Sequence, residues 1–243
     1  MKNPTISVVI IAYNEEKYIG KTLDALMRQA VKPDEILVID NNSTDNTVEI
    51  ASKYKGVRIV NEKEQGMSSA RNRGFNEAKS KILVKLDADT LLEEEFIGNI
   101  KEIFLKGGDI VGVVPRAIFP ELIWRILFNW RTGSYATEFF LGYKTCPGPS
   151  YALTRKAWKR IKGNVCNEDK KIHEDTEISM HLDNVGDVVY AKNCNSVTSS
   201  RRIKERPWQF FIEYRVRLIR QFWNNRGLLK RFRIFWGHLS PYR

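Results

Sequence analysis

Apolar and polar residues alternate along the first ninety residues in a way that predicts strands and helices in turn. Four short runs, rich in β-branched and other apolar residues, cover residues 6–12, 35–40, 57–60 and 81–86. Such runs are typical of strands buried on both faces of a parallel sheet. Between them, helical patterns cover residues 16–29, 46–54 and 68–78. The order predicts an α/β fold with a mostly parallel sheet flanked by helices.

Polar clusters follow three of these runs at the points where the predicted strands end. They occupy residues 13–16, 40–45 and 87–89. Ligands of α/β sheets bind beyond the carboxyl ends of the strands. The aspartates of the third cluster, Asp87 and Asp89, can both turn toward one hard divalent cation that keeps positions open for phosphate oxygens. The pattern indicates a site for a nucleoside diphosphate.

Each cluster also has a purely structural interpretation. Acidic residues in segment 14–16 favour the positive end of a helix dipole, and segment 42–45 can form an Asx turn and a helix N-cap. An Asp-x-Asp triplet also arises by chance in loops. Three clusters at equivalent strand ends favour the binding interpretation.

Six segments stand in a fixed order along the chain, at residues 4–16, 40–45, 70–74, 87–89, 148–158 and 173–177. In this order and spacing they resemble the family 2 glycosyltransferases of the GT-A fold, which is Rossmann-like, over about residues 4–185. Two departures are visible. Asn41 stands where the family usually has a second acid, and no histidine lies within residues 195–200, where some GT-A enzymes place a further metal ligand.

The resemblance implies a glycosyltransferase whose donor is a nucleoside diphosphate sugar. A divalent metal, Mn²⁺ or Mg²⁺, would be held by Asp89, with Asp87 sharing the ion or lying nearer the ribose, and would stabilise the charge of the leaving diphosphate. The donor-binding residues that it implies are Tyr13, Asn14, Glu15, Asp40, Arg71 and Asp87. Arg71 would lie near the base or the diphosphate; alternatively it is a solvated helix residue, and Arg73 competes with it for any anionic contact.

A second acidic pair, Glu174 and Asp175, precedes apolar residues at helical spacing, so it is expected to open a helix. Ordinary capping explains that position. In the resembled family, however, the second acid of this pair takes the proton from the acceptor hydroxyl in a single displacement that inverts the anomeric centre. Asp175 is therefore assigned as the catalytic base and Glu174 as its supporting residue. The helix start favours the ionised carboxylate, whereas burial under substrate raises its pKa, and an effective base needs a balance of the two effects.

The composition sets the outer limits. With 243 residues, of which 42% are hydrophobic, the chain can bury one substantial core. The three cysteines, Cys146, Cys166 and Cys194, form neither a disulfide framework nor a metal-binding spacing, which favours a reducing cytosol. No signal-peptide pattern opens the sequence, and no uncharged run reaches the roughly 18 apolar residues of a membrane-spanning helix.

The basic charge is concentrated at the end of the chain. From Ser200 onward there are 12 Lys and Arg and 2 acids, so this segment carries +10 of the net charge of +11, together with ten aromatic residues. Such amphipathic helices bind anionic bilayers at the headgroup level. A second aromatic stretch at residues 118–130 could add to the same membrane-facing patch. This composition predicts a peripheral enzyme on the cytosolic face of a membrane.

We therefore expect a GT-A catalytic domain over residues 1–200, with a nucleotide-sugar-binding half (1–112) and an acceptor half (113–200), followed by a basic, aromatic, amphipathic helical tail (201–243). The acceptor would be membrane-proximal and lipid-linked, as in cell-envelope or glycoconjugate biosynthesis. Acceptor or membrane contacts are assigned to Gly148, Ser150, Arg202, Arg206 and Trp208. Together with Arg201 and Pro207, the last three loosely resemble an Arg-Trp element that processive family 2 polymerases place near the donor diphosphate.

Other interpretations remain open. The tail could pack onto the catalytic domain, with a soluble or polysaccharide acceptor. Nucleic-acid binding is not expected, because no binding motif accompanies the basic stripe. A nucleotidyltransferase lacks support, since the glycine-rich basic loop that holds a triphosphate is absent. An inactive nucleotide-sugar-binding module is possible, although the presence of both acidic pairs argues against it.

Overall fold

The protein is described by a computed structural model for residues 4–121, 138, 142–146, 148–165, 174–205, 208, 212 and 216, with only the backbone at 202 and 203. The first half alternates strands and helices as the sequence predicts. Its elements are β1 (Ile6–Ala12), α1 (Ile19–Met27), β2 (Glu35–Asp40), α2 (Thr47–Ser52), β3 (Val57–Asn61), α3 (Met67–Glu77) and β4 (Ile82–Asp87). The predicted elements are confirmed, with shifts of a few residues at helix ends.

The second half adds strands to the same sheet. Its elements are β5 (Thr90–Leu92), α4 (Phe96–Leu105), β6 (Ile110–Ile118), β7 (Ser150–Thr154), α7 (Arg155–Ile161), α8 (Glu174–Asp183), β8 (Asp187–Thr198) and α9 (Arg201–Glu205). The strand order is β3-β2-β1-β4-β7-β6-β8-β5. Strands β1 to β4 pair in parallel, β6 pairs in parallel with β8, and β7 and β5 pair antiparallel with their neighbours. The mostly parallel sheet of the expected fold is confirmed.

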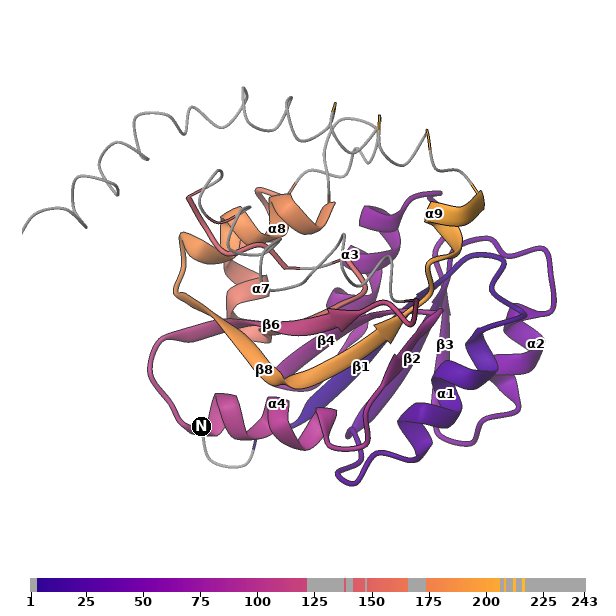
Figure 1. Ribbon diagram of the computed structural model, residues 1–243, viewed down its shortest axis with the longest axis horizontal. Helices are drawn as coiled ribbons and strands as arrows, with labels where there is room; N and C mark the ends of the chain where they lie inside the picture. The colour runs from indigo at the N-terminus through magenta and orange to yellow at the C-terminus, as the bar shows by residue number, and fades with distance from the viewer. Residues whose placement is uncertain are drawn as a thin grey trace, which may run out of the picture.

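Helices cover both faces of the sheet (Figure 1). Helices α1, α2 and α4 pack on one face, and α3, α7 and α8 pack on the other, each with its own cluster of buried apolar side chains. Along β4, Ile82, Val84 and Leu86 belong to the first cluster and Leu83 belongs to the second. Side chains alternate along a strand, so Lys85 points to the second face, beneath α3 and α8.

Close packing of α3 on the sheet depends on Gly74. A Cβ atom at this position would lie 2.2 Å from Cγ1 of Val9 and 2.9 Å from Cγ1 of Ile39. Only a residue without a side chain lets the helix backbone approach the strands this closely. Gly74 therefore sets the depth of α3 and with it the position of Arg71, one turn earlier.

The topology brings distant segments to the carboxyl end of β4. Strand β7 runs antiparallel to β4 with Leu86 opposite Ser150, and the amide of Asp87 donates to the carbonyl of Pro149 at 3.0 Å. Strand β5 pairs with β8, with Thr90 opposite Thr198. The start of β7 and the residues after β8 therefore lie beside residues 87–89.

Candidate active site

The loops after β1 and β2 are joined by hydrogen bonds around Asn14. Asn14 and Asn42 adopt positive φ angles of 55° and 66°, a conformation that asparagine tolerates better than most residues. The Asn14 amide donates to Oγ of Ser43 at 3.0 Å, and the Thr44 amide donates to Oδ1 of Asn14 at 2.8 Å. Unusual backbone held in place by its neighbours is common at binding sites.

The structural interpretation of these clusters holds for part of them. Oδ1 of Asp45 accepts hydrogen bonds from the backbone and side chain of Thr47 at the start of α2, and its Oδ2 accepts from the amide of Glu16. Asp45 therefore satisfies backbone donors at the start of α2 and in the turn before α1. The pKa of Asp45 is lowered: desolvation opposes the shift, but the hydrogen bonds from Thr47 and Glu16 outweigh it.

Asn41 has a structural role that explains its departure from the family pattern. Its side chain is buried, its Nδ2 donates to the carbonyls of Glu62 and Glu64, and its Oδ1 accepts from the amide of Gly66. A carboxylate could not donate to these two carbonyls. Asn41 thus joins the end of β2 to the loop before α3.

The residues assigned to the nucleotide sugar lie at the carboxyl edge of the parallel strands. Tyr13, at the end of β1, exposes 51% of its surface and can present its ring to a ligand. Asp40 is buried at the end of β2, where its Oδ1 accepts from the amide of Ser43 at 3.2 Å. Glu15 is buried nearby, with its amide bound to Oγ1 of Thr47 at 2.7 Å. These placements are compatible with the predicted donor side.

Arg201, the first residue of α9, reaches this edge from the far end of the chain. Its Nη2 lies 2.6 Å from Oε1 of Glu15 and 3.8 Å from Oδ2 of Asp89, and its guanidinium lies 4.7 Å from the centre of the Tyr18 ring. The ion pairs and the ring face hold the cation in place. From the sequence, Arg201 figured only in a loose resemblance to an Arg-Trp element, because only the pairing of β5 with β8 brings it next to Asp89.

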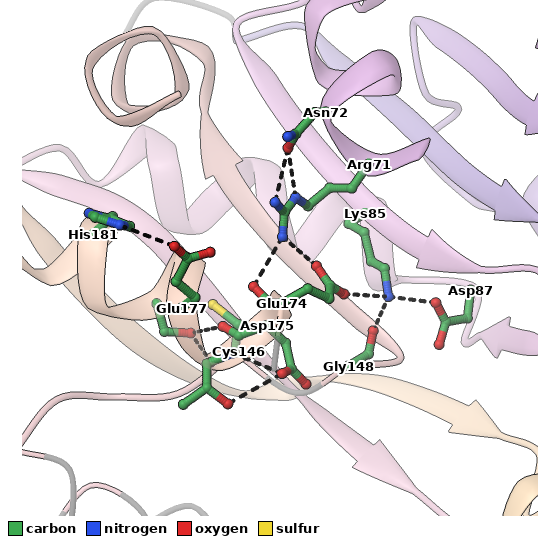
Figure 2. Close-up of polar contacts among 12 residues, drawn as sticks. Arg71, Asn72, Lys85, Asp87, Cys146, Gly148, Glu174, Asp175, Glu177 and His181 are labelled. Carbon is green, nitrogen blue, oxygen red and sulfur yellow. Dashed lines mark hydrogen bonds and ion pairs between the residues drawn. The ribbon is translucent and has the colours of Figure 1, made fainter. Parts of the chain in front are cut away.

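Arg71 is fully buried and faces the acidic pair (Figure 2). Its Nη1 lies 2.5 Å from Oε2 of Glu174 and also donates to the Glu174 carbonyl at 3.0 Å, while its Nε and Nη2 bind Oδ1 of Asn72. The alternative of a solvated helix residue is therefore wrong for Arg71. By contrast, Arg73 is 46% exposed and pairs with Glu77 in its own helix.

Lys85 is the second buried cation of the site and was also not identified from sequence. Its Nζ lies 2.5 Å from Oδ1 of Asp87, donates to the carbonyl of Gly148, and lies 3.8 Å from Oε1 of Glu174 (Figure 2). The ammonium is also 6.0 Å from the centre of the Tyr151 ring. A signal was present, because a lysine at a core position of a buried strand is costly unless paired.

The charges in this network keep both cations ionised. Desolvation alone would lower the pKa of Lys85, but the charges of Asp87 and Glu174 outweigh it and raise the pKa above its ordinary value. The pKa of Arg71 is raised in the same way, against desolvation, by the charge of Glu174. Glu174 is thus placed between two cations, which suits a supporting role better than proton transfer.

Asp175 lies in the first turn of α8, as predicted, and is half-buried. Its Oδ1 accepts from the amide of Thr176 at 2.8 Å. A Cβ atom at Gly148 would lie 3.2 Å from Oδ2 of Asp175, so the absence of a side chain at position 148 leaves room beside this carboxylate. Asp175 and Gly148 are therefore neighbours.

The remaining assigned residues are scattered. Ser150 is buried, and its hydroxyl donates to Oγ of Ser196 at 2.8 Å, so it serves the sheet interior. Trp208 is 79% exposed. Arg206, the side chain of Arg202 and residues 122–130 lie outside the described residues. In the described part of the chain, no helix has the length and hydrophobicity needed to cross a bilayer.

Comparison with known proteins adds the family. The model of glycosyl transferase family 2 matches residues 7–158, more than half of the chain. The chain belongs to glycosyl transferase family 2. The probable glycosyltransferase YdaM of Bacillus subtilis is 30% identical over 206 residues, which cover 75% of this chain and 47% of YdaM. The chain therefore spans about half the length of that relative.

Two solved structures resemble this family 2 chain in fold. The mannosyltransferase PcManGT of Pyrobaculum calidifontis, in complex with GDP-Man and Mn²⁺, is 20% identical with a TM-score of 0.69, covering 90% of this chain and 63% of that one. The glucosyl-3-phosphoglycerate synthase of Mycobacterium tuberculosis, in complex with Mn²⁺, UDP and glucosyl-3-phosphoglycerate, is 20% identical with a TM-score of 0.63, covering 89% and 80%. At this identity the likeness shows the GT-A fold alone.

The carboxylates at the end of β4 suit a divalent cation that is held mainly by phosphate oxygens of a bound nucleotide and only in part by the protein. Among the described residues, no three His, Cys, Asp or Glu side chains form a metal cluster. Asp87 and Asp89 nevertheless supply hard oxygens, and Mg²⁺ in enzymes is often held by one or two carboxylates together with substrate phosphates and water. The buried Oε2 of Glu15, close to this edge, has no hydrogen-bond partner among the described residues. As metal ligands, these carboxylate oxygens suit Mg²⁺ or Mn²⁺.

Proposed function

We propose that this protein transfers a sugar from a nucleoside diphosphate sugar to an acceptor bound beside Asp175, with inversion at the anomeric carbon. One observation carries the proposal. Asp87, at the donor edge, and Glu174, next to Asp175, are both bound by the ammonium of Lys85. The carboxylate at the donor end of β4 and the turn that carries the candidate base therefore form one connected site, as a single displacement requires.

The donor side would be formed by the ends of β1, β2 and β4. Tyr13, Asn14 and Asp40 would contact the base and ribose, and the TarS structure of Staphylococcus aureus in complex with UDP-GlcNAc, similar in fold with a TM-score of 0.63, supports a ligand of this class. A divalent cation held by Asp89, with help from Asp87, would neutralise charge on the leaving diphosphate. Arg201, 3.8 Å from Asp89, adds a positive charge at the same place.

The acceptor side would be formed by Gly148, which lies beside Asp175, and by α8. Asp175 would take the proton from an acceptor hydroxyl. At the same time the hydroxyl oxygen would bond to the anomeric carbon, and the bond from that carbon to the diphosphate would break. Glu174 would hold the turn in place through Arg71 and Lys85. An acceptor phosphate, which is already ionised at neutral pH, would need little help from this base.

We further propose that the acceptor is membrane-proximal and lipid-linked, and that the protein binds the cytosolic face of a membrane. Three apolar residues of the tail, Trp208, Ile212 and Val216, are helical, exposed by 79%, 59% and 40%, and spaced four residues apart. Residues at this spacing share one helix face. With the +10 charge after residue 199, such a face is suited to an anionic bilayer. The alternative is a tail packed on the catalytic domain, with a soluble or polysaccharide acceptor.

A panel of UDP-, GDP- and dTDP-sugars, each with Mn²⁺ or Mg²⁺, tests the proposed activity. Release of nucleoside diphosphate, by transfer or by slow hydrolysis, is expected with at least one donor. Binding of a donor without any release, with lipid-linked and soluble acceptors present, would instead favour an inactive nucleotide-sugar-binding module.

A further inference from the structure

A buried lysine stands where the fold calls for an apolar residue. In the described part of the chain the sheet has eight strands, and Lys85 lies near its middle with 0% of its surface exposed, between Leu86 and Val84, which are also fully buried. Burying a charge costs free energy that its partners must offset, and well-packed apolar residues often stabilise a protein as well as a buried ion pair does. A charge at this position therefore calls for a reason beyond stability.

The contacts of Lys85 give that reason. Its ammonium interacts with oxygens from three segments that are distant in the sequence: it donates hydrogen bonds to Oδ1 of Asp87 on β4 and to the carbonyl of Gly148 before β7, and it forms an ion pair at 3.8 Å with Oε1 of Glu174 on α8. An ammonium group has three N–H donors and can bind oxygens from three directions. Each segment carries a different part of the candidate site. Strand β4 carries the carboxylate proposed to face the nucleotide sugar, Gly148 lies on the proposed acceptor side, and the start of α8 carries the proposed base.

These contacts also restrict Asp87. Because Oδ1 of Asp87 accepts a hydrogen bond from Lys85, the carboxylate cannot rotate freely. Oδ2 is then the oxygen left to face the nucleotide sugar. The Asp87 side chain is 17% exposed, so it reaches both the buried ammonium and the open side of the site. Lys85 itself is shielded from any ligand and acts only through its partners.

We propose that Lys85 is a positioning residue that sets the place of the Asp87 carboxylate relative to Gly148 and the Glu174–Asp175 turn. The inference rests on the proposed transferase function. In that reaction the anomeric carbon of the donor and the attacking oxygen must be held in line, about 3–3.5 Å apart. Misplacement by about 1 Å can cost on the order of 10²-fold in rate.

The first test is Lys85→Met, which keeps an unbranched chain of similar length and removes the charge. With the nucleotide sugar that the donor panel identifies, kcat per folded molecule is expected to fall by ~10²-fold or more, while the donor KM changes by less than about tenfold. The matched control is Arg58→Met on β3, which removes ion pairs to Glu35 and Glu77 outside the site. It should lower the melting temperature and leave kcat unchanged.

Two further variants separate positioning from stability. Lys85→Arg keeps the charge but moves it, so kcat should fall at least about tenfold if position matters and should be retained if only charge balance matters. Combining Lys85→Met with Asp175→Asn should give a kcat close to that of the poorer single variant, because residues acting as one unit are not additive. Near-normal kcat in Lys85→Met, retained kcat in Lys85→Arg, or full additivity in the double variant would each overturn the proposal.

A crystal structure of Lys85→Met supplies a readout without activity. The Asp87 carboxylate and the Gly148 carbonyl are expected to move by about 1 Å or more, the displacement at which rates become sensitive, while the sheet stays in place. Unmoved groups would contradict the proposal. If the wild-type protein releases no nucleoside diphosphate from any donor, the proposed function fails, and this structure still decides the role of Lys85. Where Lys85→Met does not fold, the same measurement is made on Lys85→Arg.

Discussion

Arg71 of α3 and Glu174 of α8, 103 residues apart in the sequence, form a buried ion pair with 2.5 Å between Nη1 and Oε2. The guanidinium has no exposed surface, and it also binds the Glu174 carbonyl. The pair joins the helix that packs on the donor-side strands to the helix that carries Asp175. Its removal tests how much of the fold depends on this link.

Arg71→Met is expected to destabilise the protein by roughly 3–5 kcal/mol, because Glu174 then keeps a buried and poorly compensated charge. Urea denaturation followed by circular dichroism measures the change. Arg73→Met, two residues further along the same helix, is the control. It removes an exposed pair with Glu77, and pairs of that kind contribute about 0–1 kcal/mol. Equal effects of the two variants would contradict the assigned role of Arg71.

Asp89→Ala is expected to abolish transfer and the metal-dependent part of nucleotide binding, because it removes the hard oxygen ligand proposed for the cation. Calorimetric titration of UDP and GDP, with and without Mn²⁺, measures this. Glu95→Ala, which removes an exposed acid after β5, should leave the metal enhancement intact. The same enhancement in Asp89→Ala and wild type would remove Asp89 from the metal site.

Asp175→Asn is expected to lower kcat by ~10²-fold or more with little change in donor affinity, since a general base contributes about that much. Steady-state kinetics and donor titration separate the two effects. Asp183→Asn, at the other end of α8, is the control. If Asp175→Asn retains most of its turnover, product analysis will show whether the acceptor is a phosphate; with a hydroxyl acceptor, that result would leave Asp175 as a helix-start residue only.

Replacing Trp208, Ile212 and Val216 together with serine is expected to release the protein from vesicles, because these exposed apolar side chains would enter the interface. Co-sedimentation with phosphatidylserine-containing and neutral vesicles measures binding, which should rise with anionic lipid and fall with salt. Leu105→Ser removes a 44% exposed apolar residue from α4 and should have no effect. If sedimentation of the intact protein did not depend on the lipid, the proposed binding to a membrane surface would be wrong.

Acid should weaken the contact that holds the start of α9. The hydrogen bonds of Lys204 and Ser200 lower the pKa of Glu121 from 4.5 to about 2. Because the folded pKa lies below the unfolded one, the stabilisation is present above pH 4.5 and is lost as pH falls toward 2. The melting-temperature difference between wild type and Glu121→Gln should therefore be constant at neutral pH and shrink below pH 4.5. A pH-independent difference would contradict this.

Much of the fold could be predicted from the sequence alone. The strands, the helices between them and the polar clusters at the strand ends follow from local periodicity, because a residue's place on a strand or helix depends on its near neighbours. The start of α8 at Glu174 was predicted for the same reason. The order of the motifs also sufficed to identify the family.

Only the tertiary structure decided how the site is held together. From the sequence, Arg71 could be a solvated helix residue, Lys85 was a single charge in an apolar run, and Arg201 was one of many basic residues in the tail. Each acquires its partners through contacts between α3, α8, β4, β7 and the residues after β8, which lie far apart in the sequence. A local pattern reports which residues can be buried, whereas a charge becomes part of a site only when chain segments that fold separately bring its counter-charges within reach.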